Sequence, residues 1–356
     1  MMIRSFRRSL VALVSVSALL AGCVQPEDDG EEAESLVDAV TAQEGVWISR
    51  AELMALPTSG AAWDRVRSAA NGLSGSANLA DNNSNHDVGT LAAAYVAART
   101  GDAAMRAKAI RNIETVYASR YARVLEMSRN IQGYVVAADV IGPTGWDAAR
   151  FKTFVRGLAT KPLQGHSGGK NLLETAKLAP NNWGCHARAA LALIGLYTGD
   201  AALVDAAVVA QRAFVSGEGG SLKYTSTSWH AGSPRSGINV AGATIQGKNV
   251  DGVIAEDQRR TGEFTWPAPK GSYPWEALQG TVVAGVVLHR AGRLPFQTGN
   301  NAIVRAARWL TVVNANPASG DDTWQPWLLN KFGGAGLPTG AARSGKNMGF
   351  TDWTHR

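Results

Sequence analysis

Thr100-Gly101-Asp102-Ala103-Ala104 and Thr198-Gly199-Asp200-Ala201-Ala202 have the same five letters, and each separates two stretches rich in Ala, Val and Leu. Glycine suits the left-handed position that ends one helix, and aspartate caps the start of the next. Each pentapeptide therefore predicts a turn between two antiparallel helices. This αα-hairpin is the unit from which helical toroids and solenoids are built. The irregular spacing along the chain argues against a short-repeat solenoid.

Helical periodicity extends through most of the chain outward from these turns. Apolar residues recur at helical spacing in 87–99, 103–117, 129–141, 146–158, 183–198, 201–216, 274–291 and 300–313. Ser49 and Glu52 have capping-box spacing at the start of another helix. We therefore expect one all-α domain over residues 43–356.

Two segments depart from the helical pattern. Residues 217–272 are rich in Gly, Ser, Thr and Asn, and a loop of this length inside a domain is usually functional. The tail after residue 317 has no clear periodicity. We expect it to be irregular and to pack back on the domain through Trp324, Trp327 and Trp353.

The first residues have the three parts of a lipoprotein signal peptide. Arg4, Arg7 and Arg8 precede an apolar run, and Leu20-Ala21-Gly22-Cys23 follows as a lipobox. The run is too short for a permanent membrane span. We expect residues 1–22 to be removed during export and Cys23 to carry the lipid. The chain would then be anchored at the cell envelope. Val24, rather than aspartate, follows the cysteine, which in a Gram-negative cell favours the outer membrane.

The segment 23–42 holds seven acidic and no basic side chains, a composition typical of a disordered tether. The whole chain has 35 Lys and Arg against 29 Asp and Glu. Because the signal peptide holds three of the basic residues and the tether seven of the acidic ones, the domain keeps 32 against 22, a net charge of +10. Such a domain suits an anionic partner. With no nucleic-acid motif present, we expect an acidic polysaccharide.

Cysteine usage and the missing motifs exclude several classes of protein. With Cys23 lipidated, Cys185 has no partner for an intrachain disulfide, which a domain of this size does not need. Scattered histidines without an HExxH or paired-cysteine motif argue against a catalytic metal. No phosphate-binding loop, dinucleotide fingerprint or Gly-x-Ser-x-Gly elbow is present. We expect no metal, no cofactor and a monomer.

A first polar cluster, Pro180-Asn181-Asn182-Trp183-Gly184-Cys185-His186, opens a long predicted helix. The free N–H groups and the dipole of a helix start favour anions. Asn182 and His186 are four residues apart and share one helix face. Structural roles are equally open, because Asn181 suits an N-cap and His186 a contact between helices.

A second cluster runs from Asp251-Gly252 through Glu256-Asp257-Gln258-Arg259-Arg260 to Ser272-Tyr273-Pro274-Trp275. Arg259 suits bidentate pairing with a carboxylate, and Tyr273 begins a helix after the loop. The structural alternative is a surface ion pair between Glu256 and Arg260, with a half-buried tyrosine.

Together the two clusters resemble the alginate lyase family, whose members have an α/α-toroid fold. Those enzymes carry Asn-Asn-His at a helix start, then Asp-Gly…Glu-x-x-Arg, then a tyrosine before a helix, and the likeness covers roughly residues 80–290. The resemblance implies β-elimination on a uronic-acid polymer. Asn182 would neutralise the substrate carboxylate together with Arg259, and Tyr273 would act as acid and perhaps base.

The chain departs from this pattern at Trp183, which stands where the family has histidine. His186 or His230 would then supply the imidazole, unless Tyr273 is itself the base. The polymer remains open among mannuronate, guluronate and glucuronate, as does endo against exo cleavage. His166, on a Gly-rich loop, suits a lid.

Polar residues at other predicted helix starts fit a cleft for sugar acids. Ser84-Asn85-His86-Asp87 and Ser128-Arg129-Asn130 each begin a helix. We expect substrate contacts from His86, Arg129, Asn130, Trp183, His230, Arg260 and Trp275. His289 and His355 have no expected role in catalysis.

Two other functions compete with a lyase. A glycoside hydrolase would use a carboxylate pair drawn from Glu256, Asp257, Glu263 and Glu276. A surface lipoprotein that captures polysaccharide without cleaving it would need neither these carboxylates nor the catalytic residues of a lyase.

Overall fold

The computed structural model describes residues 45–225, 227–342 and 347–356, and these residues are mostly helical. The expected signal peptide, Cys23 and the acidic tether lie outside the described residues. No helix in the described ranges is long and apolar enough to cross a membrane.

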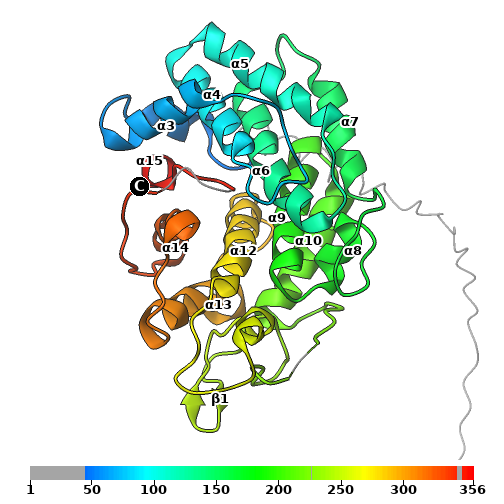
Figure 1. Cartoon of the computed structure of the whole chain (residues 1–356), viewed down its shortest axis with the longest axis vertical. Helices are drawn as coiled ribbons and strands as arrows, with labels where there is room; N and C mark the ends of the chain where they lie inside the picture. The colour runs from blue at the N-terminus through cyan, green and yellow to red at the C-terminus, as the bar shows by residue number, and fades with distance from the viewer. Residues whose placement is uncertain (1–44, 226, 343–346) are drawn as a thin grey trace, which may run out of the picture.

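A row of long helices forms the centre of the molecule (Figure 1). It runs in the order α4 (His86–Thr100), α6 (Val124–Ile141), α9 (Asn182–Thr198) and α12 (Tyr273–Arg290), each packed against the next. Most residues of these helices are buried, and the buried residues lie on all faces of each helix. A helix that is apolar all round belongs in a core, so other helices must cover this row.

Shorter helices provide that cover. The helices α3 (Ala61–Gly72) and α5 (Ala103–Glu114) pack on α4, and α7 (Ala148–Leu158), α8 (Leu172–Leu178) and α10 (Ala201–Ser216) pack on α9. Further along, α13 (Thr298–Arg308) contacts α10 and α12, and α14 (Gln325–Gly333) contacts α12 and α13. Outside the segment 217–272, the remaining elements before residue 320 are α2 (Arg50–Ala55), the 3₁₀ turn η1 (Thr115–Ala118) and the π-helical η3 (Trp309–Val313).

The last described helix packs on one of the first described helices. The helix α15 (Thr351–Thr354) lies beside α3 and α14 (Figure 1). Asp352 pairs with Arg65 of α3, and the Trp353 indole donates to the carbonyl of Pro57 at 2.9 Å. The rings of Trp63 and Trp353 are 5.1 Å apart. These contacts join α15 back to the helix next to α4.

The turns between helices have the structure that their sequence predicts. Gly101 and Gly199 are left-handed, with φ of 75° and 70°. The Asp102 carboxylate accepts from the N–H groups of Ala104 and Met105, and Asp200 caps α10 in the same way. The capping box of α2 is also confirmed, because Ser49 and Glu52 each accept from the other's backbone N–H.

Glycine allows the close approach of α12 to α9. A Cβ at Gly280 would lie 2.5 Å from the backbone nitrogen of His186, inside any normal contact distance. The main chains of these helices therefore touch at this point, and this contact fixes the position of α12 relative to α9.

The described part of the segment 217–272 is a long loop with a few short elements. It contains the hairpin β1 (Thr244–Ile245) and β2 (Lys248–Asn249), the short α11 (Ala255–Gln258) and the 3₁₀ turn η2 (Arg259–Thr261). The Asn239 side chain donates to the carbonyls of Trp229 and Val250, which ties the interior of the loop together.

Several sequence expectations were wrong in detail. The helix expected to begin at 129 begins at Val124, so Arg129 and Asn130 lie in its second turn and not at its start. The tail after 317 contains η4 (Gly320–Asp322), α14 and α15, although Trp324 and Trp353 are buried and Trp327 is half-buried, as expected. The helices α3 and α8 were not predicted, because the only large apolar residues of α3 are Trp63 and Val66 and α8 has only seven residues.

Candidate functional site

The N-terminal ends of α6, α9 and α12 meet around a pocket of about 370 Å³. The pocket contains cationic, acidic, amide and aromatic side chains together. It is lined by Asn82, Arg123, Leu125, Glu126, Asn182, Trp183, Arg260, Ser272, Tyr273 and Glu276. Residues from both predicted clusters therefore lie in one place, although nearly eighty residues of chain separate Trp183 from Arg260.

A buried carboxyl group holds the first cluster against the second. The Asp257 Oδ1 atom, on α11, accepts the backbone N–H of Asn182 at 3.0 Å. Asp257 is fully buried, and this burial raises the pKa of its carboxyl well above the usual range, against the lowering effect of that hydrogen bond. The start of α9 is thereby fixed to the short helix that precedes Arg260.

Glu276 lies at the centre of a polar network on the pocket floor. Its Oε2 accepts from Asn182 Nδ2 at 3.2 Å and lies 3.9 Å from Arg129 Nη1. Arg129 is 3% exposed and also donates to Asn82 Oδ1 at 2.8 Å. Arg129 therefore supports the wall of the pocket from behind and offsets the negative charge of Glu276.

Arg260 and Tyr273 form a pair at the pocket surface. The Arg260 guanidinium stands 4.2 Å from the centre of the Tyr273 ring, and its Nη2 donates to the phenol oxygen at 3.1 Å. Arg260 is exposed and makes no ion pair with any residue that the structure describes. A positive charge is thus available beside the phenol oxygen.

The structure separates the two neighbouring arginines. Arg259, the residue that the resemblance selects, points to the buried carboxylate of Glu256, with Nε 3.4 Å from Oε2. The alternative of an ion pair between Glu256 and Arg260 is therefore wrong, and of these two arginines only Arg260 lines the pocket. The short 3₁₀ turn η2 directs the two side chains to different places.

His230 belongs to the cluster around Glu256. Its Nε2 lies 3.4 Å from Glu256 Oε1, and the Thr225 hydroxyl and backbone N–H both bind the same carboxylate, at 2.6 and 2.7 Å. Burial lowers the pKa of the His230 imidazole, although Glu256 acts in the opposite direction. This cluster holds the long loop onto α11 and does not line the pocket.

Other expected site residues are buried in structural roles. His186 has no exposed surface, so a polymer cannot reach it. Trp275 is buried, does not line the pocket and donates to the carbonyl of Asn316, so it belongs to the core and not to a substrate platform. His86 bonds to Tyr134 and Asn112, and Asn130 donates to the carbonyls of Asn78 and Asp81. His86 and Asn130 thus stabilise α4 and the loop before it.

Trp183, one of the expected substrate contacts, lies in the pocket. It is half-buried, lines the pocket and stands 5.9 Å from the guanidinium of Arg123, which is paired with Glu126. The flat face of an indole suits contact with the apolar face of a sugar ring. Sequence reasoning missed Asn82, Arg123, Glu126 and Ser272 as pocket residues, although the polar helix starts indicated where to look.

The hydrolase carboxylates do not gather in the pocket as a set. Glu256 and Asp257 are buried, Glu263 is exposed elsewhere, and Glu276 lines the pocket together with Glu126. In the described ranges no group of three or more His, Cys, Asp or Glu side chains is placed to hold a metal ion.

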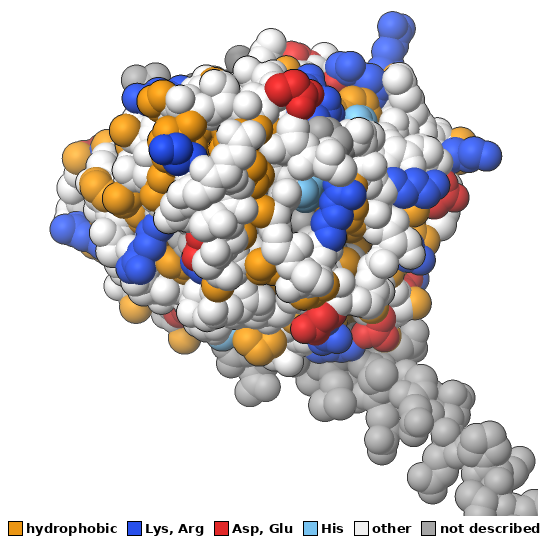
Figure 2. All heavy atoms as spheres, turned by 90° about the horizontal axis from the view of Figure 1, so that it is seen from below, with side chains coloured by type: hydrophobic (Ala, Val, Ile, Leu, Met, Phe, Trp, Pro, Cys, Tyr) orange, Lys and Arg blue, Asp and Glu red, His pale blue; other side chains and the backbone are white. Residues whose placement is uncertain are grey.

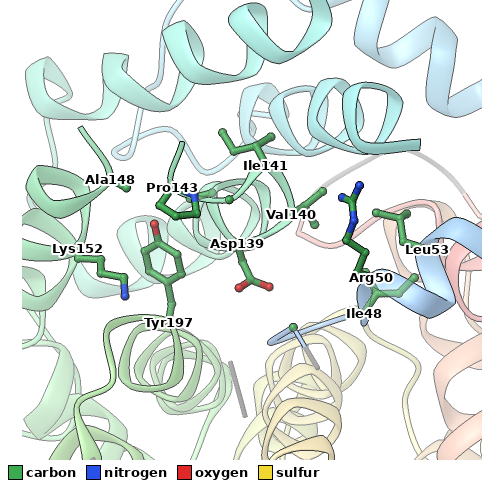
Figure 3. Close-up of a pocket in the computed structure, with 13 residues that line it drawn as sticks. Ile48, Arg50, Leu53, Asp139, Val140, Ile141, Pro143, Ala148, Lys152 and Tyr197 are labelled. Atoms are coloured by element: carbon green, nitrogen blue, oxygen red, sulfur yellow. The ribbon is translucent and has the colours of Figure 1, made fainter. Parts of the chain in front are cut away.

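A larger pocket, of about 510 Å³, lies at the opposite ends of α6 and α9. The Asp139 carboxylate points into it between Tyr197 and Ile48, with Lys152 nearby (Figure 3). Burial raises the pKa of Asp139 to about 6, against the lowering effect of the Val46 N–H bond. Gly45, the first described residue, borders this pocket, and the residues of the two predicted clusters lie outside it.

The surface around the long loop is mixed in charge. Lys and Arg side chains are spread over the face seen in Figure 2, with acidic side chains between them. On this face the positive side chains are thus not gathered into one patch, and the pocket itself combines both charges.

No protein-family model, curated protein or solved structure matches this chain.

Proposed function

We propose that the protein is a polysaccharide lyase that cleaves a uronic-acid polymer, such as alginate, by β-elimination. The observation that carries the proposal is the Arg260–Tyr273 pair beside Asn182 in a partly open pocket. An exposed cation, a phenol and an amide are the groups that this reaction requires within reach of one sugar unit.

Each group has a role in the chemistry. The proton beside a uronate carboxylate is weakly acidic, so the enzyme must stabilise the charge that develops on that carboxylate. Arg260 offers two parallel N–H groups for it, and the Asn182 amide has a second N–H beyond the one given to Glu276. Tyr273 is placed to give a proton to the departing sugar oxygen. Trp183 supports the sugar ring.

We propose that the helices form an α/α toroid, a fold that fits the proposed reaction. The neighbour order α3, α4, α6, α9, α12, α14 and α15 returns to α3, with α5, α7, α10 and α13 on the outside. The helices that line the pocket begin at one common end. An experimental structure in which α15 separates from α3 would contradict this description.

We also propose export and lipid anchoring at Cys23, which would bring the pocket to an acidic polysaccharide of the cell envelope or its surroundings. The support is the sequence of the lipobox and the charge of the domain. Labelling with a radioactive fatty acid should mark the wild-type protein and leave Cys23→Ala unlabelled. Equal labelling of both proteins would contradict the anchor.

A panel of alginate, polymannuronate, polyguluronate and glucuronan tests the proposed activity. A lyase makes a conjugated double bond, so ultraviolet absorbance rises in step with the number of new reducing ends. Reducing ends without absorbance would identify a hydrolase, for which Glu126 and Glu276 in the pocket are the available carboxylates. Binding without either product would identify a capture protein.

A further inference from the structure

β-elimination needs a proton acceptor, and burial or position excludes most imidazoles of the described chain from that role. His86, His186 and His355 are buried, and His230 is held by Glu256. His289 lies in the last turn of α12, at the far end from the pocket. His166 is different: it is half-buried and, although it does not line the pocket itself, its ring packs against Trp183, which does.

His166 contacts residues at the start of α9. Its ring centre is 5.6 Å from the ring of Trp183, which lines the pocket. The Asn181 Nδ2 atom lies 3.3 Å from His166 Nδ1 and 3.2 Å from Nε2, and the Ser167 hydroxyl lies 2.9 Å from Nδ1. Asn181 and Ser167 thus hold the imidazole beside Trp183.

The loop that carries His166 is fixed to the rest of the domain. Gln164 accepts from the backbone of Val124 at 2.8 Å and donates to Ala122 at 2.9 Å, which joins the loop to the start of α6. A Cβ at Gly169 would lie 2.7 Å from the backbone nitrogen of Thr175, so glycine lets the loop lie directly on α8. A rigid loop holds a catalytic group in a constant position.

The surroundings favour a neutral imidazole that can accept a proton. Burial lowers the pKa of His166, and the nearby Arg260 lowers it further. The Asn181 Oδ1 atom is buried and has no hydrogen-bond partner among the described residues. Rotation of the Asn181 amide would turn this oxygen toward the ring, where it would accept from a protonated nitrogen. One side chain can therefore bind both protonation states of the imidazole.

We infer that His166 is the general base of the lyase reaction and that Tyr273 is the acid, an inference that rests on the proposed function. His166 takes the proton from the carbon beside the uronate carboxylate. The electron pair of that C–H bond forms the new carbon–carbon double bond, and the glycosidic C–O bond at the neighbouring carbon breaks. Tyr273 gives its proton to the departing oxygen. One proton is taken and one is given, and no oxidant or cofactor is required.

Chemical rescue of His166→Ala tests the inference. We expect kcat to fall roughly 10²- to 10⁴-fold with KM changed less than about threefold, the range expected for loss of a general base. Added imidazole should restore part of the rate to His166→Ala and none to Tyr273→Phe. His289→Ala is the matched control, because it removes an imidazole at the far end of α12 from the pocket and should keep kcat within about threefold of wild type.

The pH profile provides a second readout, for which His166→Gln replaces the imidazole with a polar amide that does not titrate. The wild-type kcat/KM should rise with pH through the pKa of His166, below the ordinary histidine value, and this limb should vanish in His166→Gln. An active wild type with undiminished kcat in His166→Ala, or loss of activity without rescue by imidazole, would overturn this inference alone. A wild type that makes no unsaturated product would remove the proposed function and this inference with it.

Discussion

Arg259 and Arg260 are neighbours in the sequence, but their substitution should affect activity and stability differently. Arg260 is exposed and bonds to the Tyr273 oxygen, whereas Arg259 is 31% exposed and pairs with the buried Glu256. We expect Arg260→Gln to lose activity at nearly constant stability. Arg259→Gln should instead lose stability and keep most of its activity. The two substitutions are chemically identical and adjacent, so each is a control for the other.

The magnitudes follow from these contacts. Loss of one donor that stabilises transition-state charge lowers kcat about 10²- to 10³-fold, which is the effect expected for Arg260→Gln. Because Arg260 is exposed, its loss should change the free energy of unfolding by less than about 1 kcal/mol. Breaking a buried ion pair costs about 3–5 kcal/mol. For Arg259→Gln we expect about 1–2 kcal/mol, since Arg259 is partly solvated and Thr225 still binds Glu256.

Initial rates of unsaturated product formation and denaturant unfolding on the same protein preparations measure both quantities. The reasoning is refuted if Arg259→Gln loses activity at unchanged stability while Arg260→Gln remains active. That result would restore the arginine selected by the sequence resemblance and would mean that the geometry of the pocket misidentifies the cation.

Further predictions concern the fold. Gly280→Ala should destabilise the protein by about 1–3 kcal/mol in denaturant unfolding, because its Cβ would meet the main chain of α9. Gly157→Ala, in α7 with open space around the new methyl group, should raise stability by up to about 1 kcal/mol, and equal effects of the two changes would contradict the close helix contact. Burial alone would raise the pKa of Glu52, but bonds from Arg290 and Ser49 lower it from 4.5 to about 2. The stability advantage of wild type over Glu52→Gln should therefore be complete above pH 4.5 and decline as the pH falls toward 2. A stability advantage that does not depend on pH would show that the ion pair contributes nothing.

Local signals predicted the helices well because their causes are local. The Gly-Asp turns need a left-handed residue followed by a cap, and both requirements are visible in the sequence. The start of α6 was placed five residues late, since Val124 to Ser128 combine apolar and charged residues without an N-cap signal. The contact of α12 with α9 at Gly280 depends on tertiary packing, which the sequence of one helix does not reveal.

The sequence indicated which helix starts come together more accurately than it indicated which side chains line the pocket. Asn182, Trp183, Arg260 and Tyr273 do lie together, because polar residues at helix starts meet where the helices begin. Spacing alone did not distinguish Arg259 from Arg260, whose directions depend on a single 3₁₀ turn. It also did not reveal that Trp275 faces the core or that His166 lies beside Trp183, since both facts depend on long-range packing.

The most direct test of the central claim is the ultraviolet absorbance of product formed by wild type and by Tyr273→Phe on the best substrate of the uronate panel. The substitution removes the phenol oxygen and leaves the ring that Arg260 covers, so unfolding should be unchanged. We predict a steady rise in absorbance for wild type and none above background for Tyr273→Phe. Equal rates from the two proteins, or reducing ends without absorbance from wild type, would contradict the account.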